Sequence, residues 1–305
     1  MNAPHFSVLY NDIIHALSPR AGGRYIDGTL GAGGHAAGIL EASASDGELL
    51  GLDLDPQALA IATERLSRFG GRAHIVRASY LEMAGQAKKL GWDKVDGIVL
   101  DLGVSSMQLD NADRGFSFLQ DGPLDMRFDP SLGSSAADLV NNLSESDLAD
   151  IIFRYGEERL SRKIANIIVQ YRPFTTTRQL ADLLLKTIGK RERIHPATRT
   201  FQALRIAVNG ELDAVESVLP MAVNMLQPGG RLAVIAFHSL EDRIVKTYFR
   251  REGRDCLCPP QQPVCTCEHR ALINEINRKP IEAGDEEVQA NSRARSAKLR
   301  IVEKR

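Results

Sequence analysis

A glycine-rich turn, followed at a set distance by an aspartate, is the spacing in this chain that points to a nucleoside site. The turn Gly31-Ala32-Gly33-Gly34 follows a short apolar segment at 24–27, and Asp53 comes 22 residues after Gly31. Glycines let the backbone approach a ligand closely, and a carboxylate at the end of the next strand meets ribose hydroxyls in dinucleotide-type folds. The pair predicts a bound nucleoside, whereas the glycines alone could be a packing turn.

Three nucleoside cofactors compete for such a turn. ATP at a phosphate-binding loop is excluded, because no lysine with Ser or Thr follows the glycines. NAD sites use Gly-x-Gly-x-x-Gly, which the turn at 31–34 fits poorly. S-adenosylmethionine remains, because its methyltransferases carry an acidic residue before the turn, here Asp27, which can face the ammonium group. They also carry a turn like Pro228-Gly229-Gly230 before a late strand, although this could be an ordinary helix-to-strand connection.

The four cysteines form a second cluster with chemical potential. They make two Cys-x-Cys pairs separated by six residues: Cys256, Cys258, Cys265 and Cys267. Four thiolates this close could hold a structural zinc ion, although Cys-x-x-Cys is the more usual spacing. A reduced, metal-free loop and redox-labile thiols are the alternatives. Because none of the cysteines can link distant parts of the fold, we expect a reduced, cytoplasmic protein.

The elements that must position these residues alternate between strand and helix in the first hundred residues. Apolar strands are expected at 24–27, 48–53, 73–77 and 95–101, with helices at 35–41 and from residue 55. Continuous apolar strands separated by helices predict a parallel sheet covered on both faces.

The pattern then changes to helices and later returns to the sheet. A loop at 111–135 precedes three amphipathic helices, two of them with capping signals at Ser144 and Thr176. The remaining expected elements are a helix at 199–218, a turn at 227–230, a strand at 231–237, a helix at 241–250 and an edge strand at 296–302.

Composition describes an ordinary globular chain with uneven charge. Its 305 residues carry a net charge of −1, with 43% hydrophobic and 25% charged residues, which argues against wholesale disorder. No apolar run approaches the roughly 18 residues of a membrane span, and we expect no secretory signal. The segments 186–205 and 290–305 each carry six basic residues against one acidic residue. Such runs are usually solvated faces, but here they flank the expected active-site edge, where RNA phosphates would need neutralising.

Longer strings make a family resemblance specific. The chain resembles the bacterial ribosomal small-subunit RNA methyltransferase H family, of the MraW type. The strings that carry it include YIDGT at 25–29, GGH at 33–35, DLGVSS at 101–106, RGFSF at 114–118, GPLDMR at 122–127, HPATRTFQA at 195–203 and FHSLEDR at 237–243. The resemblance implies an α/β fold of the class I S-adenosylmethionine-dependent type, Rossmann-like, with a mostly parallel seven-stranded sheet. We expect this methyltransferase domain at 1–136 and 200–305, and an inserted all-helical substrate-recognition domain at 137–199.

The resemblance also implies the cofactor and the substrate. The glycine-rich turn and the resemblance together imply an S-adenosylmethionine site, which consists of Asp27, Gly31, Gly33, Gly34, His35, Asp53, Tyr80, Asp101 and Gln108. The implied reaction methylates the N4 amine of one cytosine in the decoding centre of small-subunit (16S) rRNA. The expected substrate is an assembled or nearly assembled 30S subunit, with no membrane partner, and a homodimer is left open.

A cytosine amine is a poor nucleophile, because its lone pair is delocalised, so an acceptor must hold one N–H during transfer. Many amine methyltransferases place Asp/Asn-Pro-Pro-aromatic after the fourth strand, but this chain has Asp101-Leu102-Gly103-Val104. We predict Asp101 as acceptor, with Ser105 and His238 as secondary candidates that could instead cap helices. Attack through cytosine C5 needs a cysteine nucleophile, and none lies near the fourth or fifth strand.

Aromatic and basic side chains are predicted to contact the RNA. Phe116 and Phe118 suit base stacking, although they could instead pack their loop onto the domain. The basic candidates for phosphate contacts are Lys190, Arg191, Arg193 and Arg199. A small-molecule methyltransferase with a helical lid and a non-enzymatic RNA-binding assembly protein remain as alternative functions.

Overall fold

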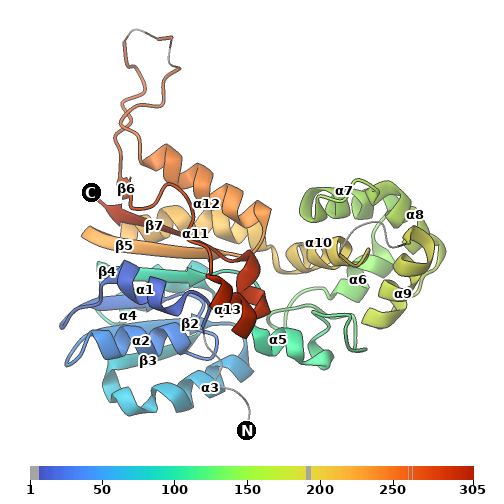
Figure 1. Cartoon of the computed structure of the whole chain (residues 1–305), viewed down its shortest axis with the longest axis horizontal. Coiled ribbons are helices and arrows are strands. Elements are labelled where there is room, and N and C mark those ends of the chain that lie inside the picture. Colours follow the sequence, from blue (N-terminus) through green and yellow to red (C-terminus); the bar gives the residue numbers. More distant parts are fainter. Residues whose placement is uncertain (1–6, 190–193, 260, 263) are drawn as a thin grey trace. The chain divides into compact units, whose positions relative to one another are not determined.

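The computed structural model of the protein describes residues 7–189, 194–259, 261–262 and 264–305 (Figure 1). The chain forms two compact units. The sheet unit consists of Met1–Gly103 and Leu212–Arg305, and the helical unit of Val104–Glu211. The helical unit extends beyond the helical domain expected at 137–199, because the loop after the fourth strand and the helix after residue 197 share its core.

The sheet unit contains a seven-stranded sheet in the order β3-β2-β1-β4-β5-β7-β6. The strands are β1 (Arg24–Asp27), β2 (Glu48–Asp53), β3 (Ala73–Arg77), β4 (Val95–Asp101), β5 (Leu226–Ala236), β6 (Ile273–Glu275) and β7 (Lys298–Lys304). The first five strands pair in parallel, whereas β7 runs antiparallel to β5 and to β6. This topology confirms the expected Rossmann-like methyltransferase fold, and the first four strands have the bounds expected from their apolar runs.

Helices cover both faces of this sheet. Ile98 and Leu100 of β4 belong to one buried cluster, and Val99 between them belongs to a second. The first cluster includes side chains of α4 (Met83–Lys89), α11 (Glu211–Met225) and α12 (Ser239–Glu252), and the second those of α1 (Tyr10–Leu17), α2 (Gly34–Ala42) and α3 (Pro56–Leu66). Burial on both sides is why the strands are apolar without alternation. The short helix α13 (Asp285–Ala290) precedes β7.

The helix expected at 199–218 is two helices. α10 (Thr198–Asn209) ends at Gly210, whose φ of 59° lies in the left-handed region, and α11 begins at the next residue. A glycine can adopt this conformation without a steric cost, so it ends a helix readily. The expectation of one continuous helix overlooked Gly210, and Pro220 lies inside α11.

Two further expectations about the sheet need correction. The turn at 227–230 lies within β5, as an irregularity across which the pairing shifts from Val95–Leu226 to Gly97–Arg231. The final strand is not at the edge, because β7 lies between β5 and β6. Its alternation was misleading: Arg300 is buried and forms an ion pair with Asp242, with an N–O distance of 2.6 Å.

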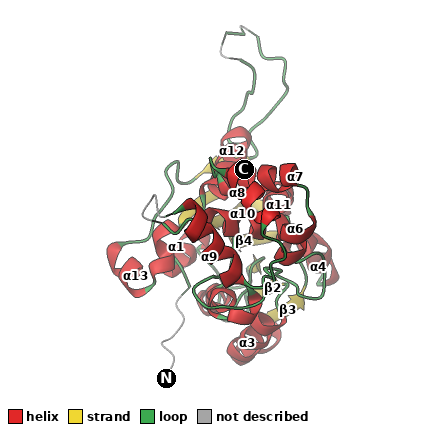
Figure 2. Cartoon of the chain, turned by 90° about the vertical axis from the view of Figure 1, so that its right-hand side faces the viewer, coloured by secondary structure: helices red, strands yellow, loops and turns green. Residues whose placement is uncertain are grey.

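The helical unit consists of helices and loops (Figure 2). Its helices are α5 (Ser106–Asp110), α6 (Ala136–Asn142), α7 (Glu145–Gly156), α8 (Ser161–Gln170), α9 (Thr177–Ile188) and α10. The three amphipathic helices expected from the sequence are α7, α8 and α9; Ser144 caps α7, and Thr176 forms a capping box with Gln179. The short helix α6 was not expected. None of the described helices in either unit is long and apolar enough to cross a membrane.

Candidate functional site

Three aspartates end three neighbouring parallel strands of the sheet unit. Asp27 ends β1, Asp53 ends β2 and Asp101 ends β4. β1 lies between the other two, and Asp27 is in register with Gly51 and with Val99. Ligands of open α/β sheets bind beyond the carboxyl ends of the strands. Parallel pairing therefore brings three carboxyl groups, distant in sequence, to the edge where a ligand is expected.

The glycine-rich turn connects β1 to α2 beside these aspartates. Gly31 has a φ of 51°, and its N–H donates to Oδ2 of Asp53 at 2.8 Å. The N–H of Asp101 donates to Oγ1 of Thr29 at 2.6 Å, which ties the turn to the end of β4. A Cβ atom added to Gly31 would meet nothing closer than the carbonyl oxygen of Thr29, at 3.9 Å. The backbone at Gly31 is thus held by its hydrogen bond to Asp53, and there is free space where a side chain would lie.

Two of the three carboxyl groups have an unsatisfied oxygen. Asp27 is 1% exposed; its Oδ1 accepts from the N–H of Thr29 at 3.1 Å, while Oδ2 has no partner among the described residues. Oδ1 of Asp101 likewise has no partner in the described part of the chain, although its side chain is 25% exposed.

Burial makes these carboxyl groups hard to ionise. It raises the pKa of Asp27 to about 7, with a smaller contribution from the charge of Asp53. It raises the pKa of Asp101 to about 8, assisted by the charges of Asp27 and Glu241. The pKa of Asp53 is also raised by burial, although backbone N–H donors oppose this. Such a group of carboxyls is electrostatically suited to a cation and unsuited to an anion.

Two other predicted cofactor contacts lie beside the turn. His35 is buried in α2, with Nε2 at 3.0 Å from the carbonyl oxygen of Val8 and Nδ1 at 3.8 Å from Oδ2 of Asp101. Burial lowers the pKa of His35 to about 4, so the ring is neutral and Nε2 carries its hydrogen. Tyr80 is near the start of the turn, because a Cβ added to Gly28 would lie 3.1 Å from the Cβ of Tyr80.

His238 follows β5 and is the N-cap of α12. Its Nδ1 accepts from the N–H of Glu241 at 3.3 Å, and the Glu241 carboxylate accepts from the N–H groups of Phe237 and His238. Nε2 of His238 lies 3.2 Å from Oε1 of Glu241, but without hydrogen-bond geometry, and it is unsatisfied among the described residues. His238 therefore has the capping role considered above and also a buried, unsatisfied nitrogen. Glu241 was missed as a site residue, although its position three residues after a cap could have indicated it.

Ser105 and Gln108 belong to the helical unit. Ser105 caps α5: its Oγ accepts from the N–H of Gln108 at 3.2 Å, and Oε1 of Gln108 accepts from the N–H of Ser105 at 3.0 Å. This reciprocal pair gives both side chains a local structural role.

The RNA-contact candidates have different surroundings. Phe116 is 7% exposed and stacks on Phe128 inside the core of the helical unit, so our expectation of a base-stacking role for it is corrected. Phe118 is partly buried against Phe201 and His195. Arg199 pairs with Glu158 at 3.5 Å. Lys190, Arg191 and Arg193 lie outside the described residues.

A polar pocket occurs at the opposite end of the strands. It is lined by residues that include Arg20, Lys94 and Asp96. Arg20 forms an ion pair with Asp96 at 2.6 Å, and Lys94 donates to the carbonyl of Asn224. Because these side chains already have partners in the protein, the pocket is a weaker candidate than the strand ends.

Comparisons with known proteins find relatives over the whole chain. Residues 2–305 match the family model described as the MraW methylase family. The ribosomal RNA small subunit methyltransferase H of Citrifermentans bemidjiense is 55% identical over 306 residues, which cover 98% of this chain and 98% of the relative. The protein of the same name from Geobacter sulfurreducens is 53% identical over 100% of both chains. That of Dehalococcoides mccartyi is 50% identical over 99% of this chain and 86% of the relative.

Proposed function

The chain belongs to the MraW methylase family, and from this premise we propose that it is an S-adenosylmethionine-dependent methyltransferase of small-subunit ribosomal RNA. The finer proposal is that it methylates the N4 amine of one cytosine in the decoding centre of 16S rRNA. The observation that carries the choice of cofactor is the set of carboxyl groups at the ends of β1, β2 and β4, two of them with an unsatisfied buried oxygen.

These carboxyls favour S-adenosylmethionine over the other nucleoside cofactors. NAD and ATP would bring phosphate groups toward three carboxyls, which costs free energy through like-charge repulsion. S-adenosylmethionine supplies, when bound, a methyl group on a positively charged sulfur, together with a cationic ammonium group and ribose hydroxyls. Oδ2 of Asp27 is available to accept from the ammonium, and the Asp53 carboxylate to accept from ribose hydroxyls. The open side of Gly31 leaves room for a close approach of the backbone.

Two side chains of the sheet unit are candidates for the group that accepts a hydrogen bond from the substrate amine. Asp101 has an unsatisfied oxygen, and a positive charge bound beside it lowers its pKa, so that the carboxylate can hold an N–H of the amine. His238 is the second candidate, because its buried Nε2 is unsatisfied among the described residues. Its Nδ1 accepts from a backbone N–H, so Nε2 of the neutral ring carries hydrogen and can only donate. We therefore propose Asp101 as the acceptor and His238 as a positioning residue.

The central experiment is methyl transfer from labelled S-adenosylmethionine to small subunits that lack the modification, followed by digestion and identification of the nucleoside. We expect N4-methylcytidine, with assembled or nearly assembled 30S subunits labelled faster than free 16S rRNA. Label found at another atom or nucleoside would overturn the N4 proposal. Label on small molecules in the absence of RNA would instead support a small-molecule methyltransferase. Faster labelling of free rRNA would overturn the preference for the subunit.

Variants separate the proposed roles. Asp101→Asn should lower the transfer rate by about 100-fold or more, the usual contribution of a positioned acceptor. Asp53→Ala should weaken cofactor binding in calorimetry by about 1–3 kcal/mol, as for lost hydrogen bonds to buried hydroxyls. Asp182→Asn, on the exposed face of α9, is a charge-matched control that should change neither value. Full activity of Asp101→Asn would contradict the proposed acceptor.

The proposed substrate and compartment follow from the same assignment. A ribosomal substrate requires a cytoplasmic enzyme, and Arg199 and the basic residues near it are proposed to contact RNA phosphates. Binding that weakens steeply with salt would support such contacts. The four cysteines take no part in this reaction, because methyl transfer to nitrogen needs no metal ion; the zinc predicted for them is a separate proposal.

A further inference from the structure

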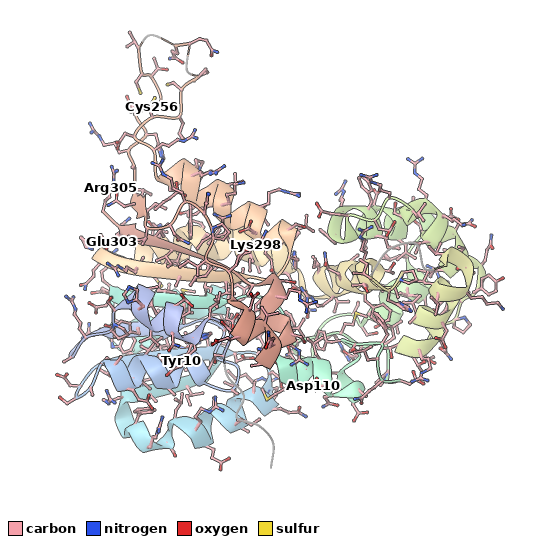
Figure 3. All side chains as sticks on the ribbon, viewed as in Figure 1. Tyr10, Asp110, Cys256, Lys298, Glu303 and Arg305 are labelled. Carbon is pink, nitrogen blue, oxygen red and sulfur yellow. The ribbon has the colours of Figure 1, made fainter. Side chains whose placement is uncertain are left out.

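The loop between α12 and β6 has almost no means of ordering itself through apolar packing. It extends away from the rest of the sheet unit in both views, and Cys256 lies within it (Figures 1, 2 and 3). Among its described residues from 254 to 272 no helix or strand occurs. Its apolar side chains Leu257 and Val264 are 41% and 69% exposed. The hydrophobic effect therefore contributes little to holding this loop in one conformation.

All four cysteines of the chain are nevertheless gathered at one point of this loop. The Sγ atoms of Cys256 and Cys265 are 3.4 Å apart, those of Cys265 and Cys267 are 3.6 Å apart, and those of Cys256 and Cys267 are 3.8 Å apart. With Cys258 included, the four sulfur atoms lie within 4.8 Å of one another. All four are free thiols, because a disulfide needs a separation of about 2.05 Å.

These distances match the coordination sphere of a single ion. Zinc holds thiolates at about 2.3 Å, which sets the sulfur–sulfur edge of a regular tetrahedron at about 3.8 Å. Four sulfurs this close surround one ion rather than a cluster of several metals. Soft thiolate ligands select zinc over magnesium or calcium, which prefer oxygen.

Backbone N–H groups around the sulfurs support the same assignment. The N–H of Leu257 donates to Sγ of Cys267 at 3.3 Å, that of Cys258 to Sγ of Cys256 at 3.4 Å, and that of Thr266 to Sγ of Cys258 at 3.5 Å. Donors aimed at sulfur stabilise thiolates, the form that binds metal. The loop backbone is thus wrapped around the four sulfurs.

We propose that Cys256, Cys258, Cys265 and Cys267 together hold one zinc ion, which fixes the conformation of the loop between α12 and β6. Four protein ligands leave no open position, so the ion is structural and activates no water. His269 is not among the proposed ligands, because the group of donor atoms that lie within 4.8 Å of one another consists of the four cysteine sulfurs. The proposal is independent of the methyl-transfer assignment.

The first test is the metal content of the full-length protein after gel filtration. Mass spectrometry of the metal should find about one zinc per chain in the wild type. Cys256→Ser and Cys265→Ser, which remove one ligand from each pair, should weaken zinc binding by more than about 100-fold and leave the purified chain largely without zinc. Gln261→Ala is the matched control: it alters an exposed polar side chain of the same loop and removes no sulfur. It should retain the zinc, while circular dichroism checks the fold of each variant.

A second test does not depend on the variants. Cobalt(II) added to zinc-free wild-type protein under reducing conditions should produce sulfur-to-cobalt charge transfer and the intense visible bands of a tetrahedral site, and zinc should displace it. Because the chain has no cysteine outside this cluster, the sulfur bands can arise only here. Absence of both zinc and cobalt–thiolate absorption would overturn the proposal. So would disulfides in protein purified under reducing conditions, or zinc retained in both cysteine variants.

Discussion

The strand ends of the sheet unit and the cysteine loop both gather reactive side chains, but by different means. Asp27, Asp53 and Asp101 come from separate parts of the chain and are brought together by the pairing of buried parallel strands. The cysteines come from twelve consecutive positions, 256–267, of an exposed loop. The fold arranges the first group before any ligand binds. The second group depends on the proposed ion for its arrangement.

The two regions also differ in how an unfavourable free energy is compensated in the ligand-free protein. An unsatisfied buried polar group costs about 1–3 kcal/mol, and Asp27 and Asp101 each have one such oxygen among the described residues. The stability of the sheet unit compensates this cost, and a cation bound there would relieve it. The loop has little apolar burial to offset the cost of gathering four sulfurs, so we expect it to open without a metal.

Removal of the metal should distinguish the two regions most clearly, because we expect only the cysteine loop to respond to it. We expect a strong chelator to increase proteolytic cleavage between residues 254 and 272 by about 10-fold or more, because the local opening free energy falls. The affinity for S-adenosylmethionine, measured by calorimetry on the same sample, should change by less than about twofold. A loop equally resistant with and without chelator would mean that it is ordered by something other than metal. A parallel loss of cofactor binding would contradict the independence of the two regions.

A methyl group at Gly31 should damage the strand-end site specifically. Gly31 and Gly91 both have positive φ, 51° and 74°, and an added Cβ has no close neighbour at either. Gly31→Ala and Gly91→Ala should therefore cost a similar amount of stability, about 1–2 kcal/mol. Only Gly31→Ala should also weaken S-adenosylmethionine binding, by about 10-fold or more, because the added group occupies the proposed cofactor side. Equal affinities of the two variants would remove Gly31 from the site.

The same contrast explains what could be predicted from the sequence. The ends of β1, β2, β3 and β4 were predicted correctly because buried parallel strands are continuous apolar runs bounded by turns and polar residues. Asp27, Asp53 and the glycine turn followed, because strand ends determine what lies at the edge. The cysteine cluster was visible as a pattern, but the spacing alone could not show that the four sulfurs converge.

The failures have equally specific causes. Base stacking and packing of the loop were both left open for Phe116, because nothing local in the sequence shows that Phe128 and the helices cover it. β7 was placed at an edge because its residues alternate between polar and apolar types, whereas the burial of Arg300 depends on its ion pair with Asp242, 58 positions away. The unsatisfied oxygens of Asp27 and Asp101 depend on which donors are absent, which is a property of the packed structure and not of the pattern.

The buried carboxyls should make the ligand-free protein less stable as pH rises above 6.5. Folding raises the pKa of Asp27 to about 7 and of Asp101 to about 8, so the folded state binds more protons than the unfolded state in this range. The free energy of unfolding then falls with increasing pH until both groups are ionised. Burial lowers the pKa of His35 from 6.5 to about 4, so its opposite contribution accrues mainly between these two values and offsets only a small part of the fall above pH 6.5.

We expect the Tm of the ligand-free protein to drop by about 4–8 °C between pH 6.5 and 8.5, for a change of about 2 kcal/mol. Asp101→Asn should flatten this dependence, because it removes one titrating group, whereas Asp182→Asn should follow the wild type. Calorimetric scans at several pH values measure both. Identical slopes in wild type and Asp101→Asn would show that Asp101 is ionised throughout, and the strand ends would then store less free energy than argued above.

The smallest effect concerns the hydrogen bond that joins the turn to β4. Thr29→Val keeps the shape of the side chain but removes the oxygen that accepts from the N–H of Asp101 at 2.6 Å. A partly buried N–H left without an acceptor should cost about 1 kcal/mol in denaturant unfolding. Thr63→Val on α3 is the control, because its hydroxyl donates to the Leu59 carbonyl at an exposed position and should matter by less than about 0.5 kcal/mol. If the two variants were equally stable, the turn and β4 would not be coupled, and the strand ends would depend on a ligand for their arrangement as the cysteine loop does.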